Sequence, residues 1–226
     1  MRLILASNSP RRREILALAG LDFTSLPADV DERLLSGEAP QDYVLRLAGE
    51  KAIAARQRLP SADMQDVLIL AADTTVAVDG RVLGKPDDAA QAEQMLRLLR
   101  GRLHLVHTAL ALLRLEDGAW LADLCTTEVH MRDYSDAEMH SYSASGDPLD
   151  KAGAYAIQHA GFNPVDWLGG CHANVMGLPL CHLRRMLETL GAPVVSGPET
   201  ACQGLLGVPC LVFEQYRHWE APIWKE

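Results

Sequence analysis

The sequence has no apolar run long enough to cross a membrane and carries little positive charge. A transmembrane helix needs roughly 18–20 apolar residues, and residues 3–6 are too few for the apolar core of a signal peptide. Lysine and arginine number 21 against 30 aspartates and glutamates, which gives a net charge of −9. This balance argues against a surface that binds nucleic acid. We therefore expect a cytoplasmic protein with neither a membrane nor a nucleic-acid partner.

Paired cysteines and several catalytic motifs are also missing. The five cysteines form no CxxC pair, so they indicate reduced, partly buried thiols and not a disulfide framework or a zinc site. The chain has no GxxxxGK(S/T) phosphate loop and no GxGxxG motif that opens a helix. It also lacks the GxSxG motif of serine hydrolases. A phosphate site in this protein must therefore be built from other residues.

The pattern that is present predicts a mixed α/β protein, with alternating strands and helices first and hairpins later. Strands are expected at 2–6 and 21–26, and around Asp-Gly turns within 67–83 and 103–134. Helices are expected at 10–19, 41–57, 87–100, 135–144 and 178–191. Residues 28–39 read as irregular, and residues 146–178 have the Gly, Asp and Asn content of a functional loop region.

The segment "ASNSPRRREIL" places consecutive arginines at a predicted helix start. Ser9 is a good N-cap, and Pro10 suits the first helical position. A helix N-terminus already carries about half a positive charge, so arginines are locally unfavourable there. Free backbone N–H groups and the guanidinium groups of Arg11 and Arg12 would together form an anion site. The alternative is a solvated arginine cluster that pairs with acids elsewhere.

Lys51 lies on the apolar face of the helix predicted at 41–57. At 100° per residue the apolar stripe consists of Val44, Leu47, Ala48 and Ala55. Lys51 falls in the middle of this stripe, where an unpaired charge is costly. Its side chain therefore either extends to the edge of the core or lines a cleft and meets an anion.

Asp73 ends the apolar run of a predicted buried strand, "VLILAAD". Ligands of open α/β sheets bind beyond the carboxyl ends of strands, so Asp73 is a candidate metal ligand or general base. A cap or turn aspartate is the alternative, and it is disfavoured because residues 74–78 continue in β-prone types. Glu32, in "DVDERL", is a second carboxylate on an irregular segment and alone would be interpreted as a solvated acid.

The segment "GDPLDKAGAYAIQ", residues 146–158, combines charge, small residues and an amide. Asp150 and Lys151 form an acid–base pair, and the small residues after them allow close approach of the backbone. Gln158 can donate and accept hydrogen bonds at once, which suits recognition of a base edge. Without other motifs this segment would be only weak evidence for a site that binds a base.

Taken together, the motifs resemble the Maf family of nucleoside triphosphate pyrophosphatases. The matching segments cover roughly residues 1–191 and are, in chain order, "ASNSPRRREIL", "DVDE", "EKA", "AADTTV", "LGKP", "HTA", "GDPLDKAGAYAIQ" and "NVMGLPL". The resemblance implies hydrolysis of a nucleoside triphosphate to the monophosphate and pyrophosphate with a divalent cation, Mg²⁺ or Mn²⁺. It also implies a mixed, twisted central sheet flanked by helices, two lobes around a nucleotide-binding cleft as in Maf and ITPase-like folds, and often a homodimer.

The resemblance also implies a role for individual residues. Asp73 matches the family's proton acceptor, and Glu32, Lys51 and Asp73 match its catalytic set, with Glu32 and Asp73 as metal ligands. Arg12, Thr74 and Gln158 match positions tied to pyrimidine choice, and Lys85, in "LGKP", matches a further lysine of the cleft. The expected substrate-binding residues are Ser9, Arg11, Arg12, Thr74, Lys85, Asp150, Lys151 and Gln158. Whether Asp73 is base, ligand or both stays open.

Within the family, "DKAGAYAIQ" resembles the branch that acts on dTTP and UTP, which predicts a housekeeping role in the nucleotide pool. One alternative is specificity for 7-methyl-GTP. Another is a non-catalytic nucleotide-binding regulator of cell division, although the intact set of Glu32, Lys51 and Asp73 argues against lost catalysis.

The chain departs from the family pattern in places. Relatives usually carry Ser-Tyr where this chain has Cys171-His172, and residues 159–168 do not align. These departures concern the rim of the cleft more than its chemistry. After the Maf-like domain of residues 1–191, residues 192–226 match nothing in the family and are expected to form a C-terminal tail of unknown role outside the core.

Overall fold

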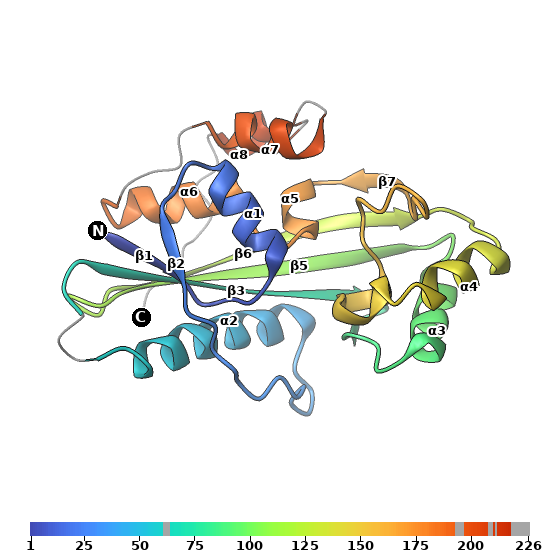
Figure 1. The fold of residues 1–226 in the computed structure, drawn as a ribbon, viewed down its shortest axis with the longest axis horizontal. Helices are drawn as coiled ribbons and strands as arrows, with labels where there is room; N and C mark the ends of the chain where they lie inside the picture. Colours follow the sequence, from blue (N-terminus) through green and yellow to red (C-terminus); the bar gives the residue numbers. More distant parts are fainter. Residues whose placement is uncertain (61–63, 193–196, 208–209, 211, 218–226) are drawn as a thin grey trace.

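A seven-stranded mixed sheet forms the centre of the computed structural model (Figure 1). The structure describes all residues except 61–63, 193–196, 208–209, 211 and 218–226. The strands are β1 (Arg2–Leu5), β2 (Phe23–Ser25), β3 (Val67–Val78), β4 (Arg81–Leu83), β5 (Leu103–Arg114), β6 (Trp120–Met131) and β7 (Val165–Gly169). Their order is β2-β1-β3-β5-β6-β7, and β4 pairs with β3. β1 lies parallel to β2 and β3, and the other pairs are antiparallel. The predicted mixed α/β class is confirmed.

The long strands β3, β5 and β6 have 12 residues each and lie next to one another in the sheet. Asp79 and Gly80 join β3 to β4 with positive φ at both positions, 51° and 72°. A two-residue hairpin turn of this kind favours Asp-Gly, because both central residues need φ above zero. The predicted Asp-Gly hairpin is therefore confirmed, and it returns the chain to the edge of β3.

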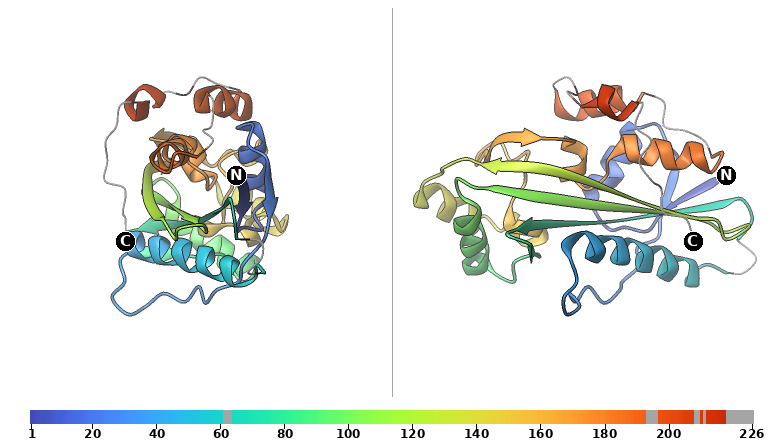
Figure 2. Two further views of the ribbon diagram at one scale, coloured as in Figure 1. Left: turned by 90° about the vertical axis from the view of Figure 1, so that its left-hand side faces the viewer. Right: turned by 180° about the vertical axis from the view of Figure 1, so that it is seen from behind.

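Helices cover both faces of the sheet (Figures 1 and 2). They are α1 (Pro10–Leu18), α2 (Pro40–Gln57), α3 (Ala89–Leu99), α4 (Asp136–Ala144), α5 (His172–Val175), α6 (Leu180–Thr189), α7 (Pro198–Leu206) and α8 (Phe213–Arg217). At one end α2 packs on one face of the sheet, and α1 and α6 pack on the other. At the far end α3 and α4 enclose a separate apolar cluster. These two ends are the two lobes.

Segment 146–178 is more ordered than a loop region. It contains the short 3-10 helices η2 (Asp147–Asp150) and η3 (Ala152–Ala154), as well as β7 and α5. The prediction of irregular structure is wrong for β7, which pairs with β6 from Glu128 to Met131. Only five residues long, β7 is too short for its alternation to be recognised.

The prediction that residues 192–226 lie outside the core is wrong for their described part. Ala192, Ala201 and Cys202 are buried in the same apolar cluster as α1 and α6. Ala201 and Cys202 lie on α7, which has only nine residues, so its periodicity extends over little more than two turns. Part of the predicted tail, including residues 218–226, lies outside the described residues. No helix that the structure describes could span a bilayer.

Candidate active site

A cleft of about 640 Å³ lies beside the middle of β3, where the two lobes meet. This volume is in the usual range for small-molecule sites, about 300–1,000 Å³. All the sequence-predicted site residues line it, namely Ser9, Arg11, Arg12, Glu32, Lys51, Asp73, Thr74, Lys85, Asp150, Lys151 and Gln158. The fold therefore brings the predicted set together, while the role of each residue stays a prediction.

The cleft forms where one edge of β3 loses its strand partners. On that edge β1 pairs with β3 up to Leu70, and β4 pairs from Val76 onward. The opposite edge is occupied by β5 from Leu68 to Ala77. Among the described residues, no strand pairs with residues 71–75 from the open side. Backbone groups exposed there need other hydrogen-bond partners.

Arg12 supplies one of these partners from the first turn of α1. Its Nη1 donates to the Ala72 carbonyl at 2.9 Å and to Ser7 Oγ at 3.1 Å. Its Nε donates to the Gly177 carbonyl at 2.9 Å, and its Nη2 donates to Thr74 Oγ1 at 3.0 Å. A guanidinium has five N–H donors, so most of them are used within the protein. Arg12 thus links α1, β3 and the loop after α5 while it lines the cleft. Its predicted contact with an anion stays a prediction.

Lys51 meets two carboxylates at the centre of the cleft. Its Nζ lies 2.5 Å from Asp73 Oδ1 and 2.7 Å from Glu32 Oε1. The side chains of Lys51 and Asp73 are only 12% and 10% exposed, whereas that of Glu32 is 47% exposed. Of the two alternatives for Lys51, the structure supports a side chain that lines a cleft and meets anions. Those anions include the other two members of the predicted catalytic set.

The two carboxylates differ in the direction of their pKa shifts. Burial raises the pKa of Asp73 above its ordinary value, although Lys51 and Arg12 act in the opposite direction. Burial also opposes ionisation of Glu32, but Lys51, Lys85 and Arg12 together hold its pKa below the ordinary value. Two neighbouring acids whose pKa values move apart are suited to separate roles, one as a proton acceptor and one as a permanent anion.

A chain of hydroxyl groups fixes Thr74. Thr108, directly opposite Thr74 in β5, donates to the Asn174 carbonyl at 2.8 Å. Since this uses the proton of Thr108, the 2.9 Å bond between the two threonines must be donated by Thr74. Thr74 therefore accepts from Arg12 and donates to Thr108. We did not predict Thr108 or Asn174 as site residues, although they lie in the segments "HTA" and "NVMGLPL".

Asn174 and Thr127 fasten α5, which precedes Gly177, to the sheet. Asn174 Nδ2 donates to the Val106 carbonyl at 3.0 Å and to Thr127 Oγ1 at 2.9 Å. Thr127 Oγ1 in turn donates to the Cys171 carbonyl at 3.1 Å. Neither residue of the Cys171-His172 departure lines the cleft. The departure therefore lies outside the lining of the cleft.

The remaining predicted cations fall into two groups. Lys151 Nζ lies 2.6 Å from Asp150 and 3.1 Å from Asp147, so its charge is balanced within its own loop. In the described part of the chain, neither Arg11 nor Lys85 makes an ion pair, and both line the cleft. These two side chains can therefore contribute charge to an anionic ligand.

Glu32 and Asp73 are the carboxylates that could hold a divalent cation. Mg²⁺ is usually held by one or two carboxylates together with phosphate oxygens and water. Within the described ranges, no group of three or more His, Cys, Asp or Glu side chains is arranged to hold a metal. Two carboxylates in one cleft fit an ion that is shared with a phosphorylated ligand.

Comparison with known proteins identifies the family. A family model described as Maf-like protein matches residues 2–190. A dTTP/UTP pyrophosphatase of Anaeromyxobacter dehalogenans strain 2CP-1 is 48% identical over 195 residues, which cover 85% of this chain and 96% of the relative. The protein of the same name from Methylobacillus flagellatus is 45% identical over 193 residues, with coverage of 85% and 94%. The chain therefore belongs to the Maf family.

Among solved structures, the Maf-family chain shows a partial likeness to a Ham1 protein. The Ham1 protein of Staphylococcus aureus aligns with a TM-score of 0.38 and 17% sequence identity. The alignment covers 59% of this chain and 73% of that protein.

Proposed function

We propose that this protein hydrolyses dTTP and UTP to the monophosphate and pyrophosphate, as a housekeeping enzyme of the nucleotide pool in the cytoplasm. The observation that carries the proposal is the meeting of Lys51, Asp73 and Glu32 at the centre of the cleft. The relatives from A. dehalogenans and M. flagellatus, matched over nearly their whole length, carry the name dTTP/UTP pyrophosphatase. Their name and the motif "DKAGAYAIQ" favour the pyrimidine branch.

In this mechanism Asp73 is the general base. Its carboxylate, which points into the cleft and is held by Lys51, takes a proton from the water that attacks the α-phosphate. Lys51 keeps the Asp73 carboxylate in place and allows Glu32 to stay ionised beside it. When bound, Mg²⁺ or Mn²⁺ held by Glu32 and Asp73 would polarise the α-phosphate.

The rest of the cleft would bind and orient the nucleotide. Arg11 and Lys85 would stabilise the negative charge that develops on the departing pyrophosphate. Gln158 is exposed in the cleft lining and offers both a donor and an acceptor to a pyrimidine edge. Thr74 and Arg12 would act together, because their side chains are hydrogen-bonded to each other.

A panel of nucleoside triphosphates tests this proposal. UTP, dTTP, CTP, GTP and 7-methyl-GTP are each incubated with the protein, with Mg²⁺ or with a chelator, and the products are separated by ion-exchange chromatography. We expect UMP and dTMP with equimolar pyrophosphate, only in the presence of the metal. Preference for 7-methyl-GTP would overturn the assignment to the pyrimidine branch. Binding of UTP without any product would instead indicate a non-catalytic nucleotide-binding protein.

A further inference from the structure

The segment that carries Glu32 has no regular structure of its own. Residues 26–39, between β2 and α2, contain neither helix nor strand. The side chain of Glu32 is nearly half exposed, yet its Oε1 lies 2.7 Å from Lys51 Nζ. A carboxylate on an irregular segment needs other contacts to keep one position, because unconstrained backbone has many states to occupy.

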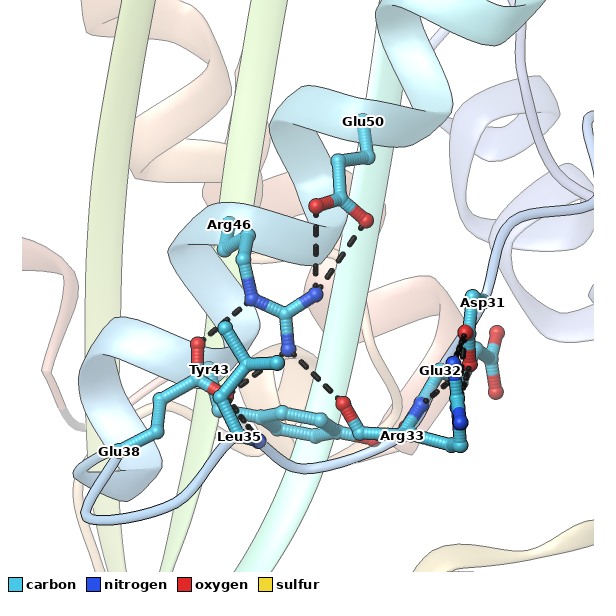
Figure 3. A network of polar contacts seen from close by, with 8 residues as sticks. All are labelled: Asp31, Glu32, Arg33, Leu35, Glu38, Tyr43, Arg46 and Glu50. Atoms are coloured by element: carbon cyan, nitrogen blue, oxygen red, sulfur yellow. Dashed lines mark hydrogen bonds and ion pairs between the residues drawn. The ribbon is translucent and has the colours of Figure 1, made fainter.

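Two side chains of α2 bind the backbone of this segment (Figure 3). Tyr43 Oη donates to the Glu32 carbonyl at 2.8 Å, and Arg46 Nη2 donates to the Arg33 carbonyl at 3.1 Å. Tyr43 and Arg46 are three residues apart and so share one face of the helix. Consecutive carbonyls are therefore held from the helix that also carries Lys51.

Arg46 is itself held firmly from both sides. Its Nε and Nη2 lie 2.6 and 2.8 Å from the two oxygens of Glu38, and its Nη1 lies 3.2 Å from Glu50. Bidentate arginine–carboxylate pairs are strong and fix the direction of the guanidinium. Glu38 also accepts a hydrogen bond from the Leu35 N–H at 3.0 Å. Arg46 thus fastens the segment at Arg33 and at Glu38, and Glu38 in turn holds the Leu35 N–H (Figure 3).

We propose that Tyr43 and Arg46 are positioning residues, which hold the Glu32 carboxylate beside Lys51 and Asp73 so that it can serve a metal–nucleotide complex. Arg46 acts through the backbone and does not line the cleft. Tyr43 lines the cleft, but its hydroxyl group is committed to the Glu32 carbonyl. The metal part of this inference rests on the proposed function, and the backbone part does not.

The chain offers a matched control. Glu50 pairs with the same guanidinium but makes no hydrogen bond or ion pair with residues 26–39, so Glu50→Gln removes a charge from the network and leaves the bonds of Arg46 to the segment in place. Arg46→Gln removes the bonds of the guanidinium to Glu38 and to the Arg33 carbonyl. Tyr43→Phe removes only the hydroxyl group that binds Glu32. Melting temperatures of all variants show whether any of them fails to fold.

The first test is limited digestion with trypsin, which cleaves after arginine. Arg33 has a highly exposed side chain, but its carbonyl is bound to Arg46 and must be released before the protease can attack it. We expect cleavage between Arg33 and Leu34 to be about tenfold faster in Arg46→Gln than in the wild type, and within twofold of the wild type in Glu50→Gln. Equal cleavage rates in all proteins would show that Arg46 does not hold the backbone at Arg33 and would overturn the proposal.

The second test measures binding of the metal–nucleotide complex without turnover. The ligand is Mn²⁺ with a UTP analogue that has a methylene group in place of the α–β bridging oxygen, titrated by calorimetry. Loss of outer partners of metal ligands typically weakens metal binding 10–100-fold. We expect about tenfold weaker binding in Arg46→Gln, about threefold in Tyr43→Phe and less than twofold in Glu50→Gln. With a chelator present, the variants should bind the analogue equally.

These readouts separate the two proposals. If Arg46→Gln is cleaved faster but binds the Mn²⁺ complex like the wild type, Arg46 only stabilises the loop and the positioning role is overturned. If the wild-type protein hydrolyses no triphosphate but the variants still lose Mn²⁺-dependent binding, the positioning role stands and the proposed activity fails. A fall in binding that is the same with and without metal would also contradict positioning of Glu32.

Discussion

The ammonium group of Lys51 lies 2.5 Å from Asp73 Oδ1, and the same nitrogen lies 2.7 Å from Glu32 Oε1. One cation on α2 thus joins a buried carboxylate of β3 to a half-exposed carboxylate of an irregular segment. Two carboxylates this close to one another would otherwise repel, and one of them would take up a proton. Lys51 therefore sets the charge state of the cleft as well as its geometry.

Replacing Lys51 by alanine should abolish most activity with limited loss of stability. Without the ammonium group, the pKa of Asp73 should rise further, and the two carboxylates should move apart. We expect kcat to fall at least about 100-fold, as is typical when an acid–base group is disturbed. The unfolding free energy should fall by only about 1–2 kcal/mol, because Glu32 can be hydrated and Arg12 remains near Asp73. Steady-state kinetics and urea unfolding measure the two effects, and normal kcat with a large loss of stability would make Lys51 structural.

The raised pKa of Asp73 has a consequence for stability. The folded protein holds this proton more tightly than the unfolded chain, so the contribution of Asp73 to the unfolding free energy declines as pH rises above about 3.9, its unfolded pKa. Asparagine does not titrate. The stability of Asp73→Asn relative to the wild type should therefore increase with pH. Urea unfolding of both proteins between pH 4 and pH 7 tests this, and a relative stability that falls with pH would mean that the pKa of Asp73 is lowered.

Arg11 and Arg12 should respond differently to the same change. Arg12→Lys leaves the Ala72 and Gly177 carbonyls without the fork of donors that reaches both, and should cost about 2–3 kcal/mol of unfolding free energy. Arg11→Lys should change stability by less than about 0.5 kcal/mol and should raise KM for the nucleotide. Thermal unfolding and kinetics of the two variants side by side provide the measurement. Equal losses of stability would show that the hydrogen bonds of Arg12 do not stabilise the contact between α1 and β3.

Gly177 should tolerate a methyl group poorly. Its φ is +98°, and a Cβ would lie 3.1 Å from Thr74 Oγ1 and 3.2 Å from Arg12 Nε. Gly20 also has a positive φ, +71°, but a Cβ there meets nothing within 4 Å. We expect Gly177→Ala to lose about 1–2 kcal/mol more stability than Gly20→Ala, and to lower kcat because Thr74 and Arg12 are displaced. Similar melting temperatures for the two variants would show that the loop adjusts freely.

Local signals in the sequence predicted much of the fold. Ser9 caps α1, with its side chain accepting from the Arg12 N–H at 3.4 Å, and Ser135 forms a full capping box with Glu138 at the start of α4. The Asp-Gly turn after β3 is equally local. The motifs also identified residues that meet in one cleft, because strand ends and loops in this fold converge beside β3.

Long-range features were beyond sequence reasoning. Arg12 turns inward because β1 and β4 leave a gap along β3, and this gap depends on pairings between distant segments. Tyr43 binds Glu32 through its backbone carbonyl. Every residue has such a carbonyl, so no pattern of side chains in the sequence indicates this contact. Burial of α7 depends on a surface formed jointly by α1 and α6. In each case the position or burial of the residue depends on a partner that is distant in the sequence, and not on the residue's own type.

The most direct test of the central claim is the rate of UMP and pyrophosphate formation from UTP by the wild type and by Asp73→Asn, at saturating Mg²⁺. Asparagine keeps the size of the side chain and removes its ability to accept the proton. We predict a fall in kcat of at least about 1,000-fold, with the fold retained. Wild-type rates in Asp73→Asn would contradict the account, because the cleft would then hydrolyse the nucleotide without its proposed base.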